Sequence, residues 1–273
     1  MNIKVFLNFI RIRSFAPLLV LAFTGAFAGA GLSSFSLPVL LALISIAIAC
    51  AGAISLNSIN DLEIDRIVHK ERPLPAGELT RSQGVAIVLI CLVLALVIAA
   101  FVNLPFFIMM ILGYGICLLY EKVTKDQGFI GNVLVALLSG VAVCGGFAVN
   151  NPVPALIISL LVFPQTLGGE ILRDVRDIAG DRLQRCILPI QIGERNATYI
   201  GCFFLGTTFI FIPVALLLHT FNEWYLPGMV LTSILLLLGI GYSVSDFKNV
   251  KKTLTITRIA LLLTLMTCII ASI

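Results

Sequence analysis

Charged residues are scarce in this chain of 273 residues, of which only 12% are Asp, Glu, Lys or Arg. Soluble domains usually carry about a quarter charged residues. The apolar fraction is 59%, and the mean hydropathy is +1.09. This composition excludes a soluble globular protein and indicates a membrane protein.

Paired cysteines and a large charge excess are also lacking. The seven cysteines form no Cys-x-x-Cys pair, and six of them lie inside apolar stretches. This pattern argues against a disulfide framework or a thiolate metal site. The net charge of +4 is too small to indicate nucleic-acid binding, so we expect no nucleic-acid partner.

The apolar residues form nine segments, and a helix needs about 20 residues to cross a bilayer. Short alternating strands of the outer-membrane type are missing, which leaves helices as the spanning elements. We therefore predict an all-α, polytopic membrane protein with nine transmembrane helices in a single domain over residues 1–273. The expected segments are 14–32, 36–57, 84–103, 105–120, 129–149, 154–172, 196–219, 224–244 and 254–273.

Lys and Arg are missing from every second connection between these segments. All 18 lie in the amino-terminal tail, in the remaining connections, or at the same end of a helix, as Arg258 does. The positive-inside rule then predicts a cell-membrane protein whose amino terminus and charged loops are cytoplasmic. A cleaved signal peptide over residues 1–30 is the alternative, but it discards Arg11 and Arg13, which fit the rule.

The charged connections themselves alternate in length. Those at 58–83 and 173–195 are long and rich in acids, whereas the other two are shorter and basic. This alternation predicts two similar four-helix halves plus a ninth helix around a central cavity. Repeated halves commonly place a binding site at their interface.

The first acidic cluster places Asn57, Asp61 and Asp65 four residues apart. Each step of four turns a helix by about 40° and rises about 6 Å, so these side chains share one face. Glu63 points roughly the opposite way.

The second acidic cluster is spaced by 4, 3 and 4 residues. These side chains form another stripe on one helix face, with Arg173 and Arg176 on its flanks: Glu170, Asp174, Asp177 and Asp181.

Stacked carboxylates repel one another unless a cation neutralises them. Solvated helix ends are the simpler interpretation. However, carboxylates without nearby His or Cys suit a hard divalent ion, most often Mg²⁺, which commonly binds a substrate phosphate as well. We therefore expect the two stripes to hold Mg²⁺ ions around a diphosphate.

Several cations lie close to the stripes in sequence. The turn from Arg66 to Gly77 contains Arg72, and a second basic stretch contains Lys122 and Lys125. These residues are candidates for phosphate contacts, although simple anchoring at the membrane surface explains the two lysines nearly as well. Tyr120 either belongs to an aromatic belt or offers its ring to a cation.

The arrangement of these residues resembles the UbiA-type intramembrane prenyltransferases over the whole chain. The first family motif, Asn-Asp-x-x-Asp-x-x-x-Asp followed by Arg-Pro-Leu-Pro-Ala-Gly, matches except that Ser58 replaces an Asp. The second motif, Asp-x-x-Asp-x-x-Gly-Asp, matches at residues 174–181. Tyr120 and Lys125 match a Tyr-x-x-x-x-Lys segment, which Gly131-Asn132 follows.

The resemblance implies a site that binds a prenyl diphosphate through Mg²⁺ and passes its chain to a lipid-like acceptor. The implied metal ligands are Asn57, Asp61, Asp65, Asp174, Asp177 and Asp181, and the implied catalytic residues are Asp61, Asp65, Asp174, Asp177 and Tyr120. The implied substrate-binding residues are Arg66, Arg72, Lys122, Lys125, Asn132 and Arg173.

Within the family, the motifs are most similar to those of the archaeal digeranylgeranylglyceryl phosphate synthases. That similarity implies transfer of a geranylgeranyl group from geranylgeranyl diphosphate to geranylgeranylglyceryl phosphate. This reaction forms the second ether bond of archaeal membrane lipids. Prenyl transfer to an aromatic acceptor and an ion-coupled transporter are the alternatives.

Overall fold

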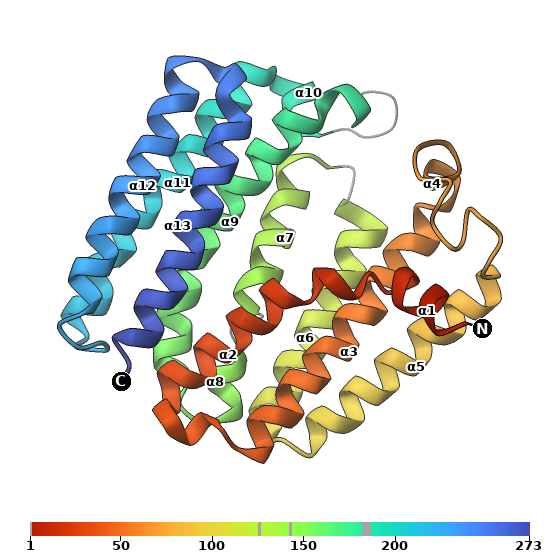
Figure 1. Cartoon of the computed structure of the whole chain (residues 1–273), viewed down its shortest axis with the longest axis horizontal. Coiled ribbons are helices and arrows are strands. Elements are labelled where there is room, and N and C mark those ends of the chain that lie inside the picture. The colour runs from red at the N-terminus through yellow and green to blue at the C-terminus, as the bar shows by residue number, and fades with distance from the viewer. Residues whose placement is uncertain (1, 125–126, 142–143, 182–186) are drawn as a thin grey trace.

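The computed structural model describes residues 2–124, 127–141, 144–181 and 187–273, and these residues form helices joined by turns (Figure 1). Nine of its segments are long and apolar enough to cross a membrane, as predicted. The chain is a multi-pass membrane protein. The long helices are α2 (Ala16–Ala30), α3 (Leu37–Asn60), α5 (Arg81–Ala100), α6 (Leu104–Leu119), α7 (Phe129–Val141), α9 (Pro152–Asp181), α11 (Glu194–Leu217), α12 (Tyr225–Ser245) and α13 (Val250–Ile270).

Local sequence explains where several long helices begin. α3 and α6 each carry a proline in the first turn, Pro38 and Pro105, where a missing amide hydrogen costs no helical hydrogen bond. Thr80 precedes α5 and forms a reciprocal capping box with Gln83. These signals place the helix starts within a few residues of the predicted ones.

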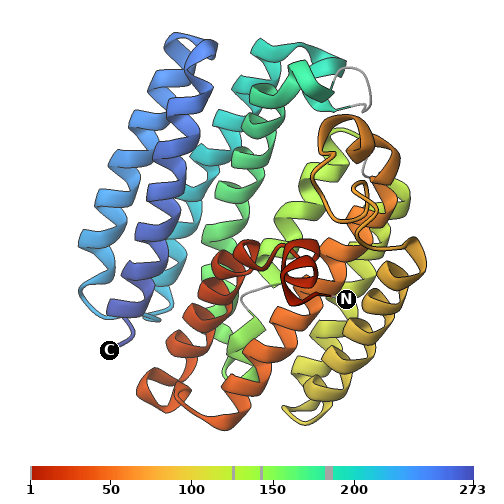
Figure 2. The same cartoon turned by 45° about the vertical axis from the view of Figure 1, so that its right-hand side comes forward.

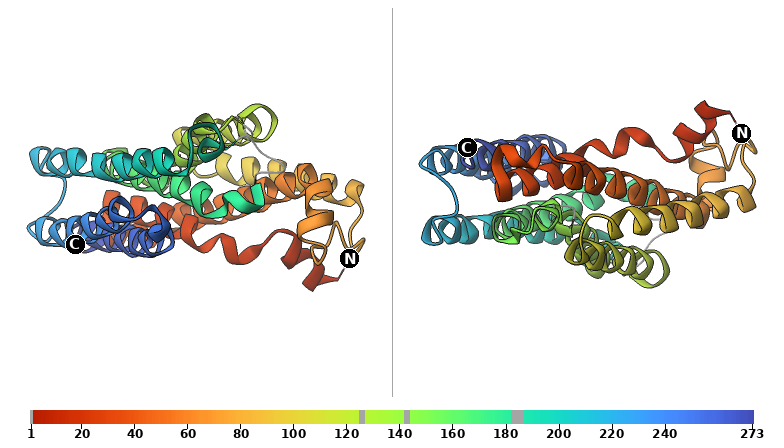
Figure 3. Two further views of the ribbon diagram at one scale, coloured as in Figure 1. Left: turned by 90° about the horizontal axis from the view of Figure 1, so that it is seen from above. Right: turned by 90° about the horizontal axis from the view of Figure 1, so that it is seen from below.

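The helices that follow the two long connections pack against the helices that precede them. α3 lies along α5, and α9 lies along α11, while α12 lies along α13. Seen from above, α12 and the amino-terminal region lie at opposite ends of an elongated body (Figure 3). α2 contacts α3 on one side and α9 and α13 on the other, and so joins the two groups of helices.

Three short helices were not predicted: α1 (Ile3–Phe9), α4 (Leu62–Val68) and α10 (Leu188–Ile192). α4 and α10 follow the two acidic clusters and lie at the same end of the bundle (Figures 1 and 2). We call this end of the bundle the acidic end. α1 packs beside α3 through Phe9, which is 2% exposed, and a core that includes Ile59.

Two predicted segments differ from the observed helices. The segment predicted to end at residue 172 continues as α9 to Asp181, so the second acidic stripe lies on the extension of a spanning helix. The segment 129–149 contains two helices, α7 and α8 (Gly145–Ala148). α8 packs tightly on α2, because a Cβ atom at Gly145 would overlap the carbonyl oxygen of Ala22.

Candidate active site

The first acidic stripe crosses a break between two helices. α3 ends at Asn60 and α4 begins at Leu62, with Asp61 between them. The four-residue pattern nevertheless continues, because the Asp61 amide donates to the Asn57 carbonyl at 2.9 Å and the Asp65 amide donates to the Asp61 carbonyl at 2.8 Å. Asp61 and Asp65 therefore lie on one buried face, 9% and 2% exposed.

Glu63 lies on the other side of the same turn, as its position in the helix predicted. Its side chain is 79% exposed and pairs with Arg66 at 2.8 Å. Arg66, an expected substrate contact, is also exposed and is directed to this neighbouring acid. The chain thus separates a solvated ion pair from the buried carboxylates two residues away.

The loop after α4 folds back and brings Arg72 onto the first stripe. A guanidinium nitrogen of Arg72 lies 2.5 Å from Asp65 Oδ1. Leu74 is 6% exposed and anchors the loop, and Gly77 turns the chain with φ 75°, a conformation that favours glycine. Asp65 Oδ2 is buried and has no hydrogen-bond partner within the described part of the chain.

The second acidic stripe belongs to one continuous helix, α9. Asp174 accepts a 2.9 Å hydrogen bond from Asn132 Nδ2 on α7, and Asn132 is 6% exposed. Asp177 is exposed and receives two hydrogen bonds, of 2.7 and 2.6 Å, from its neighbour Arg176. Asp181 ends the helix, and its side chain lies outside the described residues.

The remaining predicted cationic residues differ in their surroundings. Arg173 is exposed and pairs with Glu170 at 2.7 Å. Lys122 is exposed in a π-helical turn that begins at Tyr120, while Lys125 lies outside the described residues. Asn60 Nδ2 donates to Glu121 Oε2 at 3.1 Å and so ties the end of α3 to this turn.

Arg11, which the motifs did not identify, lines a pocket beside the first acidic stripe. One of its guanidinium nitrogens donates to Ser58 Oγ at 3.2 Å, and the same pocket is lined by Asp65 and Arg72. Burial and the like charge of Arg72 lower the pKa of Arg11, while Asp65 and Asp61 raise it. In the sequence, Arg11 served only to orient the first helix. One further feature of the sequence pointed to the site: Arg11 lies shortly before the first span, on the side of the membrane where the two acidic clusters are predicted.

The carboxylate and amide oxygens of the two acidic clusters are the type of ligand that Mg²⁺ prefers. Over the described ranges, no three Asp, Glu, His or Cys side chains gather at one point that could hold a metal ion. Mg²⁺ in proteins needs only one or two carboxylates when a substrate phosphate completes its shell. The buried oxygens Asp65 Oδ2 and Asn132 Oδ1, which lack partners there, belong to this class of ligand.

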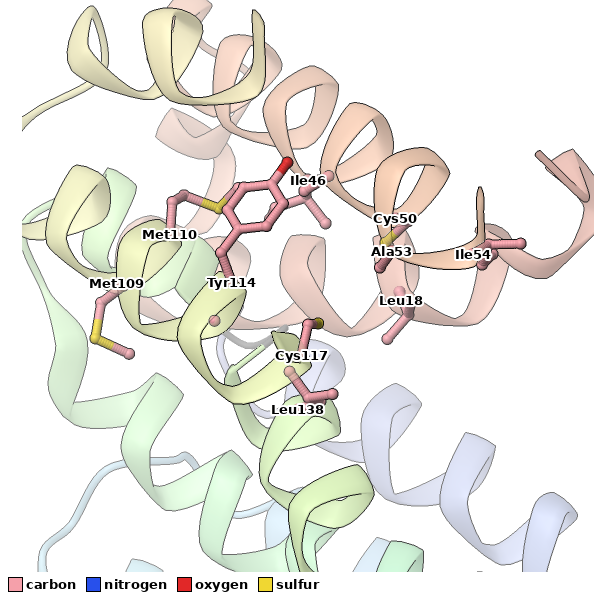
Figure 4. A pocket seen from close by; sticks show the side chains of 12 residues that line it. Leu18, Ile46, Cys50, Ala53, Ile54, Met109, Met110, Tyr114, Cys117 and Leu138 are labelled. Carbon is pink, nitrogen blue, oxygen red and sulfur yellow. The ribbon is translucent and has the colours of Figure 1, made fainter. Parts of the chain in front are cut away.

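An apolar cavity of about 180 Å³ opens between α2, α3, α6 and α7 (Figure 4). Its lining is almost entirely hydrocarbon and sulfur, and the Tyr114 hydroxyl there donates to the Cys91 carbonyl at 3.4 Å. A second apolar hollow lies between α6, α7, α8 and α9. Both suit an isoprenoid chain and disfavour water. The labelled lining residues are Leu18, Ile46, Cys50, Ala53, Ile54, Met109, Met110, Tyr114, Cys117 and Leu138.

Relatives with assigned names resemble this chain over most of its length. A digeranylgeranylglyceryl phosphate synthase from Methanococcus maripaludis is 32% identical over 247 residues, which cover 88% of this chain and 87% of that one. The enzyme of the same name from Thermococcus kodakarensis is 33% identical over 191 residues, covering 68% and 69%.

Solved structures share the fold. A structure of digeranylgeranylglyceryl phosphate synthase superposes with a TM-score of 0.89 at 26% identity, covering 99% of this chain and 98% of that one. A UbiA homologue from Archaeoglobus fulgidus, bound to GPP and Mg²⁺, gives 0.73 at 20% identity, covering 98% and 99%.

The sequence profile of the UbiA prenyltransferase family matches residues 18–269, which include both acidic clusters and all nine spans except the edges of the first and last. The profile, the named relatives and the shared fold agree. The chain therefore belongs to the UbiA prenyltransferase family, and it is a membrane prenyltransferase.

Proposed function

We propose that this prenyltransferase moves a geranylgeranyl group from geranylgeranyl diphosphate to geranylgeranylglyceryl phosphate, with Mg²⁺ as its cofactor. The observation that carries the proposal is the 32% identity, over 88% of the chain, to an enzyme named for this product. The site is consistent with it, since buried carboxylates and arginines stand at the acidic end and an apolar cavity lies between the helices.

The diphosphate binds at the acidic end and the isoprenoid chain extends into the apolar cavity. Asn57, Asp61, Asp65, Asp174, Asp177 and Asp181 would hold Mg²⁺, and its positive charge would stabilise the diphosphate as a leaving group. Arg72, Lys122 and Lys125 contact phosphate oxygens, and Arg66 and Arg173 supply further positive charge at the same end. The relative from Archaeoglobus fulgidus, which binds GPP and Mg²⁺, supports this assignment.

The reaction breaks the allylic carbon–oxygen bond, and the electron pair leaves with the diphosphate. The acceptor hydroxyl oxygen attacks the allylic carbon, and its proton passes to a carboxylate or to the diphosphate. Tyr120 and Asn132 border the cationic carbon, while the apolar cavity wall excludes water that would otherwise capture it. Asn132 also orients Asp174 through its hydrogen bond.

The acidic end faces the cytoplasm of the cell in this proposal, because the Lys and Arg residues concentrate in the connections at that end. Single cysteines in a Cys-free background test the orientation. Cysteines at positions 103, 151 and 222 should react with an impermeant thiol reagent from outside intact cells, and one at position 70 should react only after lysis. Outside labelling at position 70 would reverse the topology.

The acceptor is tested by competition in proteoliposomes. Geranylgeranylglyceryl phosphate, its dephosphorylated form and 4-hydroxybenzoate are offered with geranylgeranyl diphosphate and Mg²⁺, and the products are identified by mass. The proposal expects the phosphorylated acceptor to be prenylated and its dephosphorylated form to react far more slowly. If only 4-hydroxybenzoate is prenylated efficiently, the proposed acceptor is wrong, while the assignment to the family is unaffected.

A further inference from the structure

Arg11 is held in a position that its local sequence does not favour. Its backbone adopts φ 50° and ψ 54°, in the left-handed region that non-glycine residues seldom occupy. Residues on both sides fix this turn, because Phe9, Ile10 and Phe15 are 2%, 5% and 7% exposed. Strained backbone of this kind persists where packing imposes it and often occurs at functional sites.

The packing directs the Arg11 side chain into a pocket beside the first acidic stripe. The walls come from the end of α1, from Ser58 on α3, and from the loop that carries Arg72. The complete lining is Asn8, Phe9, Arg11, Ser58, Asp65, Arg72, Pro73, Leu74 and Pro75.

Among the residues that line this pocket, positive charges outnumber negative ones. Asp65 is its one carboxylate, and Arg72 already contacts that carboxylate at 2.5 Å. Arg11 is hydrogen-bonded to the neutral Ser58 hydroxyl and has no acid within ion-pair distance among the described residues. The lining of the pocket therefore holds two guanidinium groups and one carboxylate, and Asp61, outside the lining, also attracts Arg11.

A half-buried cation that makes no direct ion pair is stabilised when an anion binds to it. Guanidinium groups bind phosphate through two parallel hydrogen bonds, so a phosphate group is a suitable anion for Arg11. We infer that Arg11 is a phosphate-binding residue of the active site, acting beside Arg72 on a phosphate group of one substrate. The inference rests on the proposed function insofar as the substrates are phosphorylated.

Three substitutions separate charge from hydrogen bonding. Arg11→Gln removes the charge, and Arg11→Lys keeps the charge but not the paired geometry. Ser58→Ala removes the hydroxyl that accepts from Arg11 at 3.2 Å and donates to the Ile54 carbonyl at 3.0 Å. Arg81→Gln is the matched control, because Arg81 is an exposed arginine in the first turn of α5. All variants are made in the full chain and assayed in proteoliposomes with saturating Mg²⁺.

The readouts are the inhibition constants of inorganic pyrophosphate and of glycerol phosphate, together with kcat and KM for each substrate. Arg11→Gln should weaken inhibition by one of these anions by about ten- to a hundredfold, the range for a hydrogen bond to a charged group. Arg11→Lys should weaken this inhibition less, and Ser58→Ala should leave the inhibition constants within about threefold of the wild type. Arg81→Gln should match the wild type.

The two inhibitors distinguish the source of the phosphate. If inhibition of Arg11→Gln by pyrophosphate alone is weaker, Arg11 binds the diphosphate of the prenyl donor. If inhibition by glycerol phosphate alone is weaker, Arg11 binds the phosphate of the acceptor. Unchanged inhibition by both, with only kcat reduced, overturns the inference and leaves Arg11 a structural residue. If Arg11→Gln does not fold, Arg11→Lys decides by the same criteria. The pyrophosphate measurement works with any prenyl acceptor, so it remains informative if the proposed acceptor is wrong.

Discussion

The two acidic clusters have similar spacing in sequence but are held in different ways. In the first, Asp61 and Asp65 are 9% and 2% exposed, and the partner of Asp65 comes from a loop that folds back over it. In the second, Asp177 is exposed and its partner is the adjacent residue on the same helix. The first cluster is part of the folded core of the acidic end, and the second lies on the last turns of α9, near the end of its apolar span.

This difference separates the consequences of mutation. Removing one member of a buried ion pair leaves an uncompensated charge and costs about 3–5 kcal/mol, whereas an exposed pair contributes about 0–1 kcal/mol. Substitutions in the first cluster should therefore alter stability and activity together. Substitution of the exposed Asp177 in the second should alter activity almost alone.

The largest effect is expected for Arg72→Ala, which leaves the buried carboxylate of Asp65 without its partner. The free energy of unfolding should fall by about 3 kcal/mol, at the lower end of the range because Arg72 is itself 27% exposed. Prenyl transfer should fall at least about a hundredfold, since a phosphate contact is lost as well. Denaturation in mixed micelles and initial rates measure the two effects.

A double variant sharpens this first prediction. Asp65→Asn combined with Arg72→Ala removes both charges and should recover part of the lost stability while remaining inactive. If the double variant is less stable than Arg72→Ala by the full cost of Asp65→Asn alone, the two side chains are not coupled. That result would contradict the buried ion pair.

Asp177→Asn tests the second cluster. The free energy of unfolding should stay within about 1 kcal/mol of the wild type, because Asp177 is 45% exposed and its partner Arg176 is 26% exposed. Activity should fall about tenfold or more at limiting Mg²⁺, since a charged metal ligand is lost. Rates measured over a Mg²⁺ titration provide the check, and a large loss of stability with a normal Mg²⁺ dependence would make Asp177 a structural residue.

Asn132→Ala should give an intermediate effect. It removes the 2.9 Å hydrogen bond that orients Asp174, and loss of such a supporting contact typically weakens metal binding by about 10- to 100-fold. Stability should fall by about 1–2 kcal/mol. Ser139→Ala on the same helix is the matched control, because the Ser139 hydroxyl donates to a carbonyl of its own helix. Equal Mg²⁺ requirements for the two variants would remove Asn132 from the metal site.

The spans were predictable because a bilayer imposes one simple requirement, about 20 apolar residues per crossing. The predicted face of Asp61 and Asp65 depended only on helical geometry, which survives the break at Asp61. By contrast, α9 was predicted too short, because hydropathy marks where a helix leaves the membrane and not where its hydrogen bonding ends. α1 and α4 were missed because seven-residue helices are stabilised by tertiary packing.

The contacts within the site could not be predicted from the sequence, because they also depend on tertiary packing. Asn132 and Asp174 are 42 residues apart, and Arg11 and Ser58 are 47 residues apart. Such pairs form only because helices pack in a particular register. Arg72 was predicted as a phosphate contact from its motif, but its pairing with Asp65 depends on a loop path that the burial of Leu74 and Leu79 determines.

The smallest effect is expected for Glu63→Ala, two residues from each buried carboxylate of the first cluster. Its side chain is 79% exposed and its partner Arg66 is 56% exposed, so the pair contributes at most about 1 kcal/mol. Because Glu63 lies off the face that carries Asp61 and Asp65, activity should stay within about threefold of the wild type. Asp61→Ala, assayed beside it, should lose most activity. Equal losses in the two variants would show that negative charge near the end of α3, and not the orientation of particular carboxylates, is what the reaction requires.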